Sequence, residues 1–282
     1  MALTNLATGA GLTQAAGAFT PEDLGSLIVT ALKGQSIAAQ SATVTSTDRD
    51  KVLFPKFAAN PDVAHYSELD LIALGDPETD EVEALIYKTA GATRQSRELV
   101  ADSTPNTADL VGAALAEQII RAVDGAYLAA TTPKGPGGLL GTGYTSVDTG
   151  ASLTNLDAFV SAKYAALANR GEITNWIISP TVAEQVSQLK VGSGSNQNLL
   201  QFVENGMMIA GVPVLISDQV DAATKFWGIS KARTVLVIRE GTKVERSTES
   251  AFLNDAVDLK ATFRYGLGFL HEPANVRGYD AV

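Results

Sequence analysis

The sequence predicts an α+β fold, because helical and strand-like segments follow one another without regular β-α-β alternation. Two stretches carry this prediction. Residues 108–130 form an alanine-rich helical segment that leads into the glycine-rich segment 135–143. Residues 257–265 show the cleanest strand pattern, since apolar and polar side chains alternate there. We expect a half-buried antiparallel strand at 257–265, with one face turned to water or to a neighbour.

Composition narrows the class of protein. The 282 residues are 45% hydrophobic and 6% aromatic, which indicates a globular chain with a core of small side chains. The absence of cysteine excludes disulfides, thiol catalysis and thiolate metal sites. A net charge of −10 argues against a nucleic-acid-binding surface. No apolar run is long enough to span a membrane, and no secretion signal is evident, so we expect a soluble intracellular protein.

The first half of the chain is predicted to contain an arm, a short helix and a long excursion. Residues 1–19 lack a periodic apolar face, and a capped helix follows at 20–34. Strand-like segments at 51–57 and 82–88 flank the acidic stretch 58–81, which has two turn signals and no lysine or arginine. Because a long isolated hairpin is marginally stable in water, we expect this excursion to rest on its own domain or on an adjacent subunit.

The second half is predicted to mix short helices with strands. A helix begins at a Thr154 cap, has Asp157 in its first turn and ends at Gly171. One face of this helix consists of Leu156, Val160, Lys163 or Tyr164, and Leu167. The remaining expected elements are a strand at 175–179, a helix from Ser179-Pro180 to about 190, an exposed loop at 193–198, and strands at 207–217, 225–230, 234–239 and 242–246.

No catalytic constellation emerges from the sequence. The glycine-rich segment 135–143 follows a helix and lacks the spacing of both nucleotide-binding fingerprints, so a hinge is the better interpretation. Ser187 and Lys190 match an SxxK pattern, and Ser217-Asp218 partly matches the SDN motif of serine β-lactamases. No KTG motif follows, so both matches are attributed to chance.

Metal and cofactor sites are not predicted either. His65 and His271 are isolated, which argues against a histidine triad or a multi-histidine metal site. Trp176 and Trp227 lie in apolar runs and are expected in the core. A group of acidic residues lacks the spacing of a calcium loop and is read as a solvated loop; it comprises Glu68, Asp70, Asp76, Glu78, Asp80, Glu81 and Glu83. The sequence therefore predicts no catalytic, cofactor-binding or metal-binding residue.

The order of several short motifs is more informative than any one of them. These are the helix-bearing arm at 21–44, the excursion at 57–85 with HYSE at 65–68, SRELVADS at 96–103, the helix followed by PGGLLGTG, NWIISPTVAEQVSQLK at 175–190, IAGVPVLISDQV at 209–220, and VDLKATFRYGLGFLHEPANV at 257–276. In this order they resemble the major capsid proteins of tailed bacteriophages, whose HK97-like capsid fold is shared with bacterial encapsulins. The resemblance covers about 21–280.

The resemblance implies four structural parts. They are an N-terminal arm with a short helix (1–50), an E-loop hairpin with flanking strands (51–88), a peripheral domain with a long spine helix (89–135 and 230–270), and an axial domain (136–229 and 271–282). The E-loop would lie across the adjacent subunit, and the axial domain would meet its copies around five-fold and quasi-six-fold axes. The segment 135–143 would be the pivot between the two domains.

The implied function is mechanical, with no enzyme activity and no cofactor. The protein would form a homo-oligomer of pentamers and hexamers, an icosahedral shell around double-stranded DNA that it does not read by sequence. It would reside in the virion after assembly in the host cytoplasm, with a separate scaffolding protein, a portal and a decoration protein as candidate partners and no membrane. Two alternatives remain: an encapsulin-type shell around a cargo enzyme, and a soluble enzyme that uses the glycine-rich segment.

Two departures from the family concern maturation. Some relatives begin with a long, charged scaffold segment that is later removed, whereas residues 1–19 here are uncharged. We therefore expect no internal scaffold and no large proteolytic maturation. Some relatives join subunits by an isopeptide bond between an E-loop lysine and an asparagine near the last strand. Asn254 lies near the second position, but 57–87 contains no lysine, so we expect a non-covalent shell.

Overall fold

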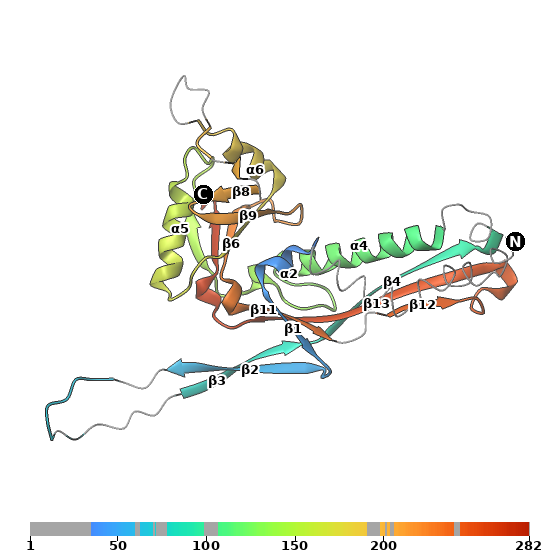
Figure 1. Cartoon of the computed structure of the whole chain (residues 1–282), viewed down its shortest axis with the longest axis horizontal. Helices are drawn as coiled ribbons and strands as arrows, with labels where there is room; N and C mark the ends of the chain where they lie inside the picture. Colours follow the sequence, from blue (N-terminus) through green and yellow to red (C-terminus); the bar gives the residue numbers. More distant parts are fainter. Residues whose placement is uncertain are drawn as a thin grey trace, which may run out of the picture. The chain divides into compact units, whose positions relative to one another are not determined.

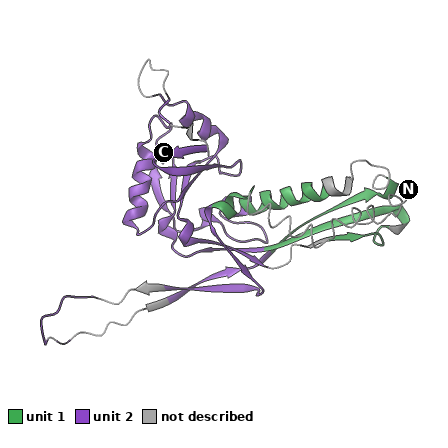
Figure 2. Cartoon of the chain, in the orientation of Figure 1, with its two compact units in different colours: residues 1–40, 88–124, 240–264 green, residues 41–87, 125–239, 265–282 purple. Residues whose placement is uncertain are grey.

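A five-stranded sheet, a seven-stranded sheet and a two-stranded hairpin form the β-structure of the computed structural model (Figure 1). The structure describes residues 35–59, 63–69, 71, 78–98, 107–190, 198–200, 202–203, 206–239 and 243–281. The helix predicted at 20–34 and most of the predicted loop at 193–198 lie outside these residues. The chain divides into two compact units, shown in Figure 2: unit 1 comprises 1–40, 88–124 and 240–264, and unit 2 comprises 41–87, 125–239 and 265–282.

Both element types occur throughout the described chain, as an α+β fold requires. The helices are α2 (Ile37–Ser41), α4 (Thr107–Leu128), α5 (Asp157–Ala168) and α6 (Pro180–Ser187), with short 3-10 turns η1 (Leu139–Gly141), η2 (Lys231–Arg233), η3 (Phe252–Asn254) and η4 (Glu272–Ala274). The strands are β1 (Thr43–Thr47), β2 (Lys51–Ala59), β3 (Glu78–Leu85), β4 (Tyr87–Ser96), β5 (Thr145–Asp148), β6 (Asn175–Ile178), β7 (Phe202–Val203), β8 (Gly206–Ile209), β9 (Val212–Ile216), β10 (Thr224–Ile229), β11 (Thr234–Arg239), β12 (Lys243–Ser247), β13 (Ala256–Phe269) and β14 (Val276–Tyr279).

Strand β13 is the centre of the five-stranded sheet. The sheet order is β1-β11-β13-β12, and β4 also pairs with β13. From Val257 to Tyr265 the apolar side chains of β13 are buried, while the alternate polar residues are partly or fully exposed, so the predicted half-buried strand is confirmed. The following residues, up to Phe269, are buried on both faces. Glycine at 266 is required there, because a Cβ would lie 2.5 Å from the Leu85 carbonyl oxygen.

Strands β2 and β3 form the stem of the predicted excursion. They pair antiparallel from Lys51 opposite Leu85 to Ala59 opposite Glu78, which confirms the two-stranded arrangement. Pro55 lies in β2 opposite Glu81 and is tolerated because, among the described strands, β2 has β3 as its one neighbour.

The seven-stranded sheet belongs to unit 2 and has the order β5-β14-β10-β6-β9-β8-β7. Helices α5 and α6 contribute to the core on one of its faces. The middle of this core is an aromatic trio in which the Phe159 ring stacks on Phe226 at 4.3 Å and meets Trp176 edge-on at 5.2 Å. Trp176 and Trp227 are completely buried, which confirms their predicted place in the core.

Helix α4 matches its prediction within two residues at each end, since it spans Thr107–Leu128 rather than 108–130. In unit 1 it packs on the sheet next to β4, where Leu115 lies 3.1 Å from the position a Cβ on Gly91 would take. Helix α6 starts as predicted, because the Ser179 hydroxyl caps it by accepting a hydrogen bond from the Val182 amide at 3.3 Å. It ends at Ser187 rather than near 190.

The predicted start and orientation of α5 are wrong. The helix begins at Asp157, and Asn155 rather than Thr154 supports its first turn, by donating to the Asp157 carboxylate and accepting from the Asp157 amide. Its buried residues are Phe159, Ala162 and Ala166. Of the predicted face, Leu156 packs against the core, whereas Val160, Tyr164 and Leu167 are exposed. The helix also ends earlier, at Ala168, and the amide of Gly171 then donates to the Ala166 carbonyl at 2.8 Å.

Candidate inter-subunit surfaces

The β2–β3 hairpin combines a charged stem with exposed apolar side chains further out. Lys51 pairs with Glu83 and Lys56 with Asp80, each at 3.0 Å between nitrogen and oxygen. The hydrogen bond from Lys56 and a second from the Glu81 amide lower the pKa of Asp80. Further out, three apolar side chains are at least nine-tenths exposed: Val63, Leu69 and Leu71. The remaining residues between the two strands, 60–62, 70 and 72–77, lie outside the described part of the chain.

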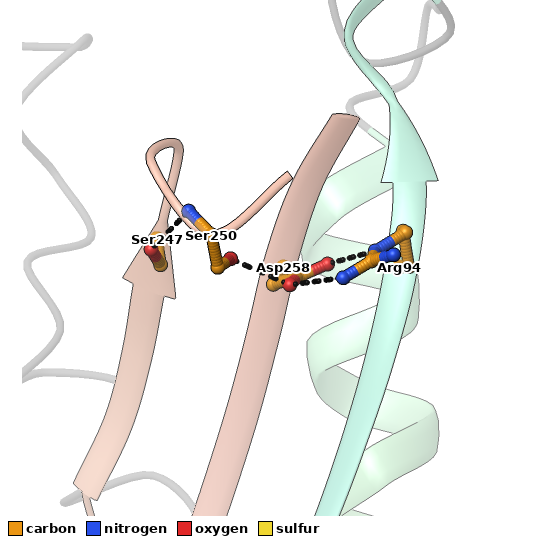
Figure 3. Close-up of polar contacts among 4 residues, drawn as sticks. All are labelled: Arg94, Ser247, Ser250 and Asp258. Carbon is orange, nitrogen blue, oxygen red and sulfur yellow. Dashed lines mark hydrogen bonds and ion pairs between the residues drawn. The ribbon is translucent and has the colours of Figure 1, made fainter. Parts of the chain in front are cut away.

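The polar face of β13 forms a hydrogen-bonded row with its neighbours in unit 1 (Figure 3). The Arg94 guanidinium on β4 donates hydrogen bonds to both carboxylate oxygens of Asp258, at 2.7 and 2.9 Å. The Ser250 hydroxyl donates to the same carboxylate at 2.6 Å. The bond from Arg94, followed by that from Ser250, lowers the pKa of Asp258 to about 2. Two residues further along β13, Lys260 pairs with Glu245 across the β12–β13 ladder.

This row lines a shallow groove of about 470 Å³ between β4, β12 and β13. Its charged groups are paired with one another, so it is a satisfied cross-strand network rather than a set of free reactive groups. The sequence predicted the polar face of β13, but it did not predict which residues of β4 and β12 complete the network. Residues opposite each other in a sheet are fixed by register, which no local pattern specifies.

The glycine-rich segment 135–143 packs against the end of α4 in unit 2. A Cβ on Gly138 would lie 2.1 Å from the Ala126 carbonyl oxygen, and one on Gly141 would lie 2.4 Å from that of Ala130. Both distances are far below any real carbon–oxygen contact, so these two glycines permit close backbone approach. The structure thus gives the segment a packing role that the hinge interpretation did not include.

A buried aspartate on α4 was missed by the sequence reasoning. Asp124 is 6% exposed and lies in unit 1, where it receives hydrogen bonds from the Ser36 hydroxyl at 2.5 Å and from the amides of Ile37 and Ala38 at 3.1 and 3.0 Å. It therefore caps the first turn of α2 from a distant part of the chain. An isolated aspartate within an alanine-rich helix gives no sequence signal for this contact.

The residues considered for catalysis have structural partners. The Ser187 hydroxyl donates to the Ala183 carbonyl one helical turn back, and Lys190 bonds Asn198. Ser217 is buried and accepts a hydrogen bond from the Gln219 amide. The imidazole of His271 contacts the Asn169 carbonyl at 2.8 Å. None of these contacts joins a serine to a histidine or a lysine.

His65 is exposed, in the described part of the excursion. Within the described ranges, no three histidine, aspartate or glutamate side chains gather as a metal site would require. In the same residues, no helix has both the length and the hydrophobicity needed to cross a membrane.

Comparison with known proteins identifies this architecture. The sequence matches the phage capsid family over residues 16–277. No curated protein matches it. Among solved structures, the capsid of an empty GTA particle, computed with C5 symmetry, aligns with a TM-score of 0.73 and 18% identity over 98% of this chain and 99% of that chain.

Two phage structures align with this chain about as well as the GTA capsid does. One from Mycobacterium phage Bobi aligns with a TM-score of 0.72 and 12% identity, over 88% of this chain and 91% of that chain. One from Gordonia phage Cozz aligns with a TM-score of 0.72 and 15% identity, over 88% of this chain and 87% of that chain. At these identities the structures establish the fold, and the family match covers most of the sequence. The chain therefore belongs to the phage capsid family and is a capsid protein of the head shell.

Proposed function

We propose that this chain is the major capsid protein of a tailed phage and assembles into pentamers and hexamers that close an icosahedral shell around double-stranded DNA. The observation that carries the proposal is the β2–β3 hairpin, in which Val63, Leu69 and Leu71 are almost completely exposed. Large apolar side chains at an extended tip are stable when a neighbour covers them. A shell supplies that neighbour as an adjacent copy of the chain, which is the role expected of an E-loop.

The charge of the chain is compatible with enclosing DNA. A net charge of −10 gives the protein the same sign as the phosphate backbone, so the wall does not immobilise the genome. The role is structural rather than enzymatic, because the Ser187 and Ser217 hydroxyls and the His271 imidazole make hydrogen bonds within the fold. The predicted division into arm, E-loop, peripheral domain and axial domain belongs to this proposal, with 1–50, 51–88, 89–135 with 230–270, and 136–229 with 271–282 as its parts.

Other components are needed to complete such a particle. A separate scaffolding protein sets the shell size, a portal occupies one vertex, and a decoration protein is a further candidate partner. Assembly takes place in the host cytoplasm, and the mature protein resides in the virion. None of the comparisons favours the alternative, an encapsulin-type shell.

The test is electron microscopy of particles that form when the full chain is produced, followed by analysis of their content. We expect discrete icosahedral particles, and in particles from infected cells we expect nuclease-protected double-stranded DNA. A chain that stays a dispersed monomer under all assembly conditions would refute the proposal. Particles that hold a cargo enzyme and no DNA would instead support the encapsulin alternative.

A further inference from the structure

Two glycines of β13 lie under the inner end of the β2–β3 hairpin. Gly266 and Gly268 are two residues apart, so they share one face of the strand. A Cβ on Gly266 would lie 2.5 Å from the Leu85 carbonyl oxygen, and one on Gly268 would lie 3.5 Å from the Ala84 Cβ and 3.6 Å from the Phe54 ring. Because a Cβ points away from the plane of the sheet, the hairpin crosses over the face of β13 here. The two glycines thus form a shallow recess that the hairpin occupies.

One face of the stem is packed onto the sheet at this point. Four side chains form this contact, the hairpin root: Val52, Phe54, Ala84 and Ile86. They pack with Val235 and Val237 of β11 in a small core, in which Ala84 and Val237 are completely buried. Leu53 and Leu85 alternate with the root residues along the chain and are exposed. The stem therefore has one face seated on the sheet and one face open.

A second attachment lies at the bend before β2. The Ile86 amide donates to the Asp50 carbonyl at 3.0 Å, which joins the inner ends of the two strands. The Arg239 guanidinium, at the end of β11, pairs with the Asp50 carboxylate and ties the bend to the sheet. All of these residues belong to unit 2 (Figure 2). Two attachments restrict rotation of the hairpin about the point where it leaves the sheet.

We propose that the recess formed by Gly266 and Gly268 is a positioning device, which sets the direction of the hairpin before any neighbouring copy is present. An isolated two-stranded ribbon is marginally stable in water, so its direction must come from what its root packs on. The root contacts are made within one chain. The consequence for assembly rests on the proposed function, because a shell requires each hairpin to reach a defined place.

The direction is sensitive to the recess because the root is short and the stem is long. Non-bonded atoms attract best at about 3.5 Å, so a Cβ at 266 would displace the Leu85 backbone by about 1 Å. The hairpin moves rather than β13, which is held by β11 with Val237 opposite Gly266. The root spans two residues, about 7 Å, so this displacement tilts the stem by about 8°. The backbone would then move by about 2 Å at Glu81 and about 3 Å at Glu78.

The distance between two spin labels tests the direction in the unassembled full chain. The chain has no cysteine, so Thr45→Cys with Glu81→Cys places one label on β1 and one on the stem, both at exposed positions. We expect a single narrow distance distribution. Adding Gly266→Ala should shift its mean by about 2 Å or broaden it, because the root no longer seats. Gly268→Ala is the matched control, since its Cβ makes ordinary contacts, and should leave the distribution unchanged.

Two results would overturn the inference and leave the shell function intact. A broad distribution in the labelled parent would show that the hairpin has no fixed direction. Equal distributions with Gly266→Ala and with Gly268→Ala would show that the recess does not set the direction. Failure of the unmodified chain to form particles is a different result, since it overturns the proposed function while the direction measured in the unassembled chain stands.

Particle formation by the same variants connects the direction with assembly. Gly268→Ala should form particles like the parent, whereas Gly266→Ala should form several-fold fewer regular particles although its unassembled chain still melts cooperatively. Normal particles from a Gly266→Ala chain whose label distance has shifted would contradict the role in assembly. If Gly266→Ala does not fold, Phe54→Ala decides, because it removes the ring that lies on Gly268. A distribution that stays narrow and unshifted in Phe54→Ala would then overturn the inference.

Discussion

Replacing Gly138 by alanine is the sharpest test of how the segment 135–143 functions. The new Cβ would lie 2.1 Å from the Ala126 carbonyl oxygen and 2.6 Å from those of Tyr127 and Ala129. All three atoms belong to the backbone at the end of α4, so no side-chain rotation relieves the clash. The segment or the helix end must move by about 1 Å, and overpacking of this kind costs about 3 kcal/mol.

The adjacent glycine provides a matched control. A Cβ on Gly137 would meet the Ala130 carbonyl oxygen at 3.7 Å, an ordinary contact. The substitution Gly137→Ala should therefore be neutral or stabilise by up to about 1 kcal/mol, because it restricts the unfolded chain. For a unit of this size, 3 kcal/mol corresponds to a fall in Tm of roughly 6–12 °C.

Differential scanning calorimetry of particles from the parent and from both variants measures this difference. We expect Gly138→Ala to melt lower than Gly137→Ala by that margin. Equal melting temperatures would refute the packing argument, because they would mean that the segment leaves the end of α4 freely. The hinge interpretation would then be the correct one.

Three further predictions concern the other contacts. Asp124→Ala removes the acceptor for the amides of Ile37 and Ala38, so it should destabilise α2 locally by about 2 kcal/mol. Hydrogen exchange of both amides should then be roughly 30-fold faster, and unchanged exchange would contradict the capping role. Hydrogen bonds from Arg94 and then Ser250 lower the pKa of Asp258 from 3.8 to about 2, so these contacts stabilise the fold above about pH 4 and the stabilisation is lost as the pH falls toward 2. Acid unfolding of Asp258→Asn should accordingly show a weaker pH dependence between pH 4 and 2 than the parent, and identical profiles would exclude the pair as a contributor. Boiled particles in SDS should run as a single band of monomer size, because 57–87 offers no lysine for a cross-link, and a ladder of oligomers would show the opposite.

The parts of the fold that depend on local pattern could be predicted from the sequence. The polar–apolar alternation of β13 appears in the structure as burial on one face, and the alanine-rich segment became α4 with nearly the predicted ends. The β2–β3 hairpin followed from two strand-like segments around turn signals. In each case the period of the pattern matches the period of the element, so neighbours along the chain are enough.

The parts that depend on distant partners could not be predicted. Helix α5 has apolar residues on both sides, and three of its four large ones, Val160, Tyr164 and Leu167, are on the exposed side, so the pattern alone favoured the wrong face. Asp124 is 86 to 88 residues from the groups it binds. The parallel pairing of β14 with β5 joins Val276 to Thr145 across more than a hundred residues. These choices are set by tertiary packing, which overrides local preference.

The hairpin has a consequence for the chain before it enters any shell. Two-stranded ribbons offer unpaired backbone edges on which free copies of a concentrated protein can stack into fibres. The stem of this hairpin carries Lys51 and Lys56 on β2 and Asp80 and Glu83 on β3, together with Pro55, which cannot donate a backbone hydrogen bond. Charged side chains and a proline on an exposed strand edge disfavour edge-to-edge aggregation. We therefore expect the ribbon, which we propose rests on a neighbouring copy in the shell, to stay soluble during the interval between synthesis and assembly.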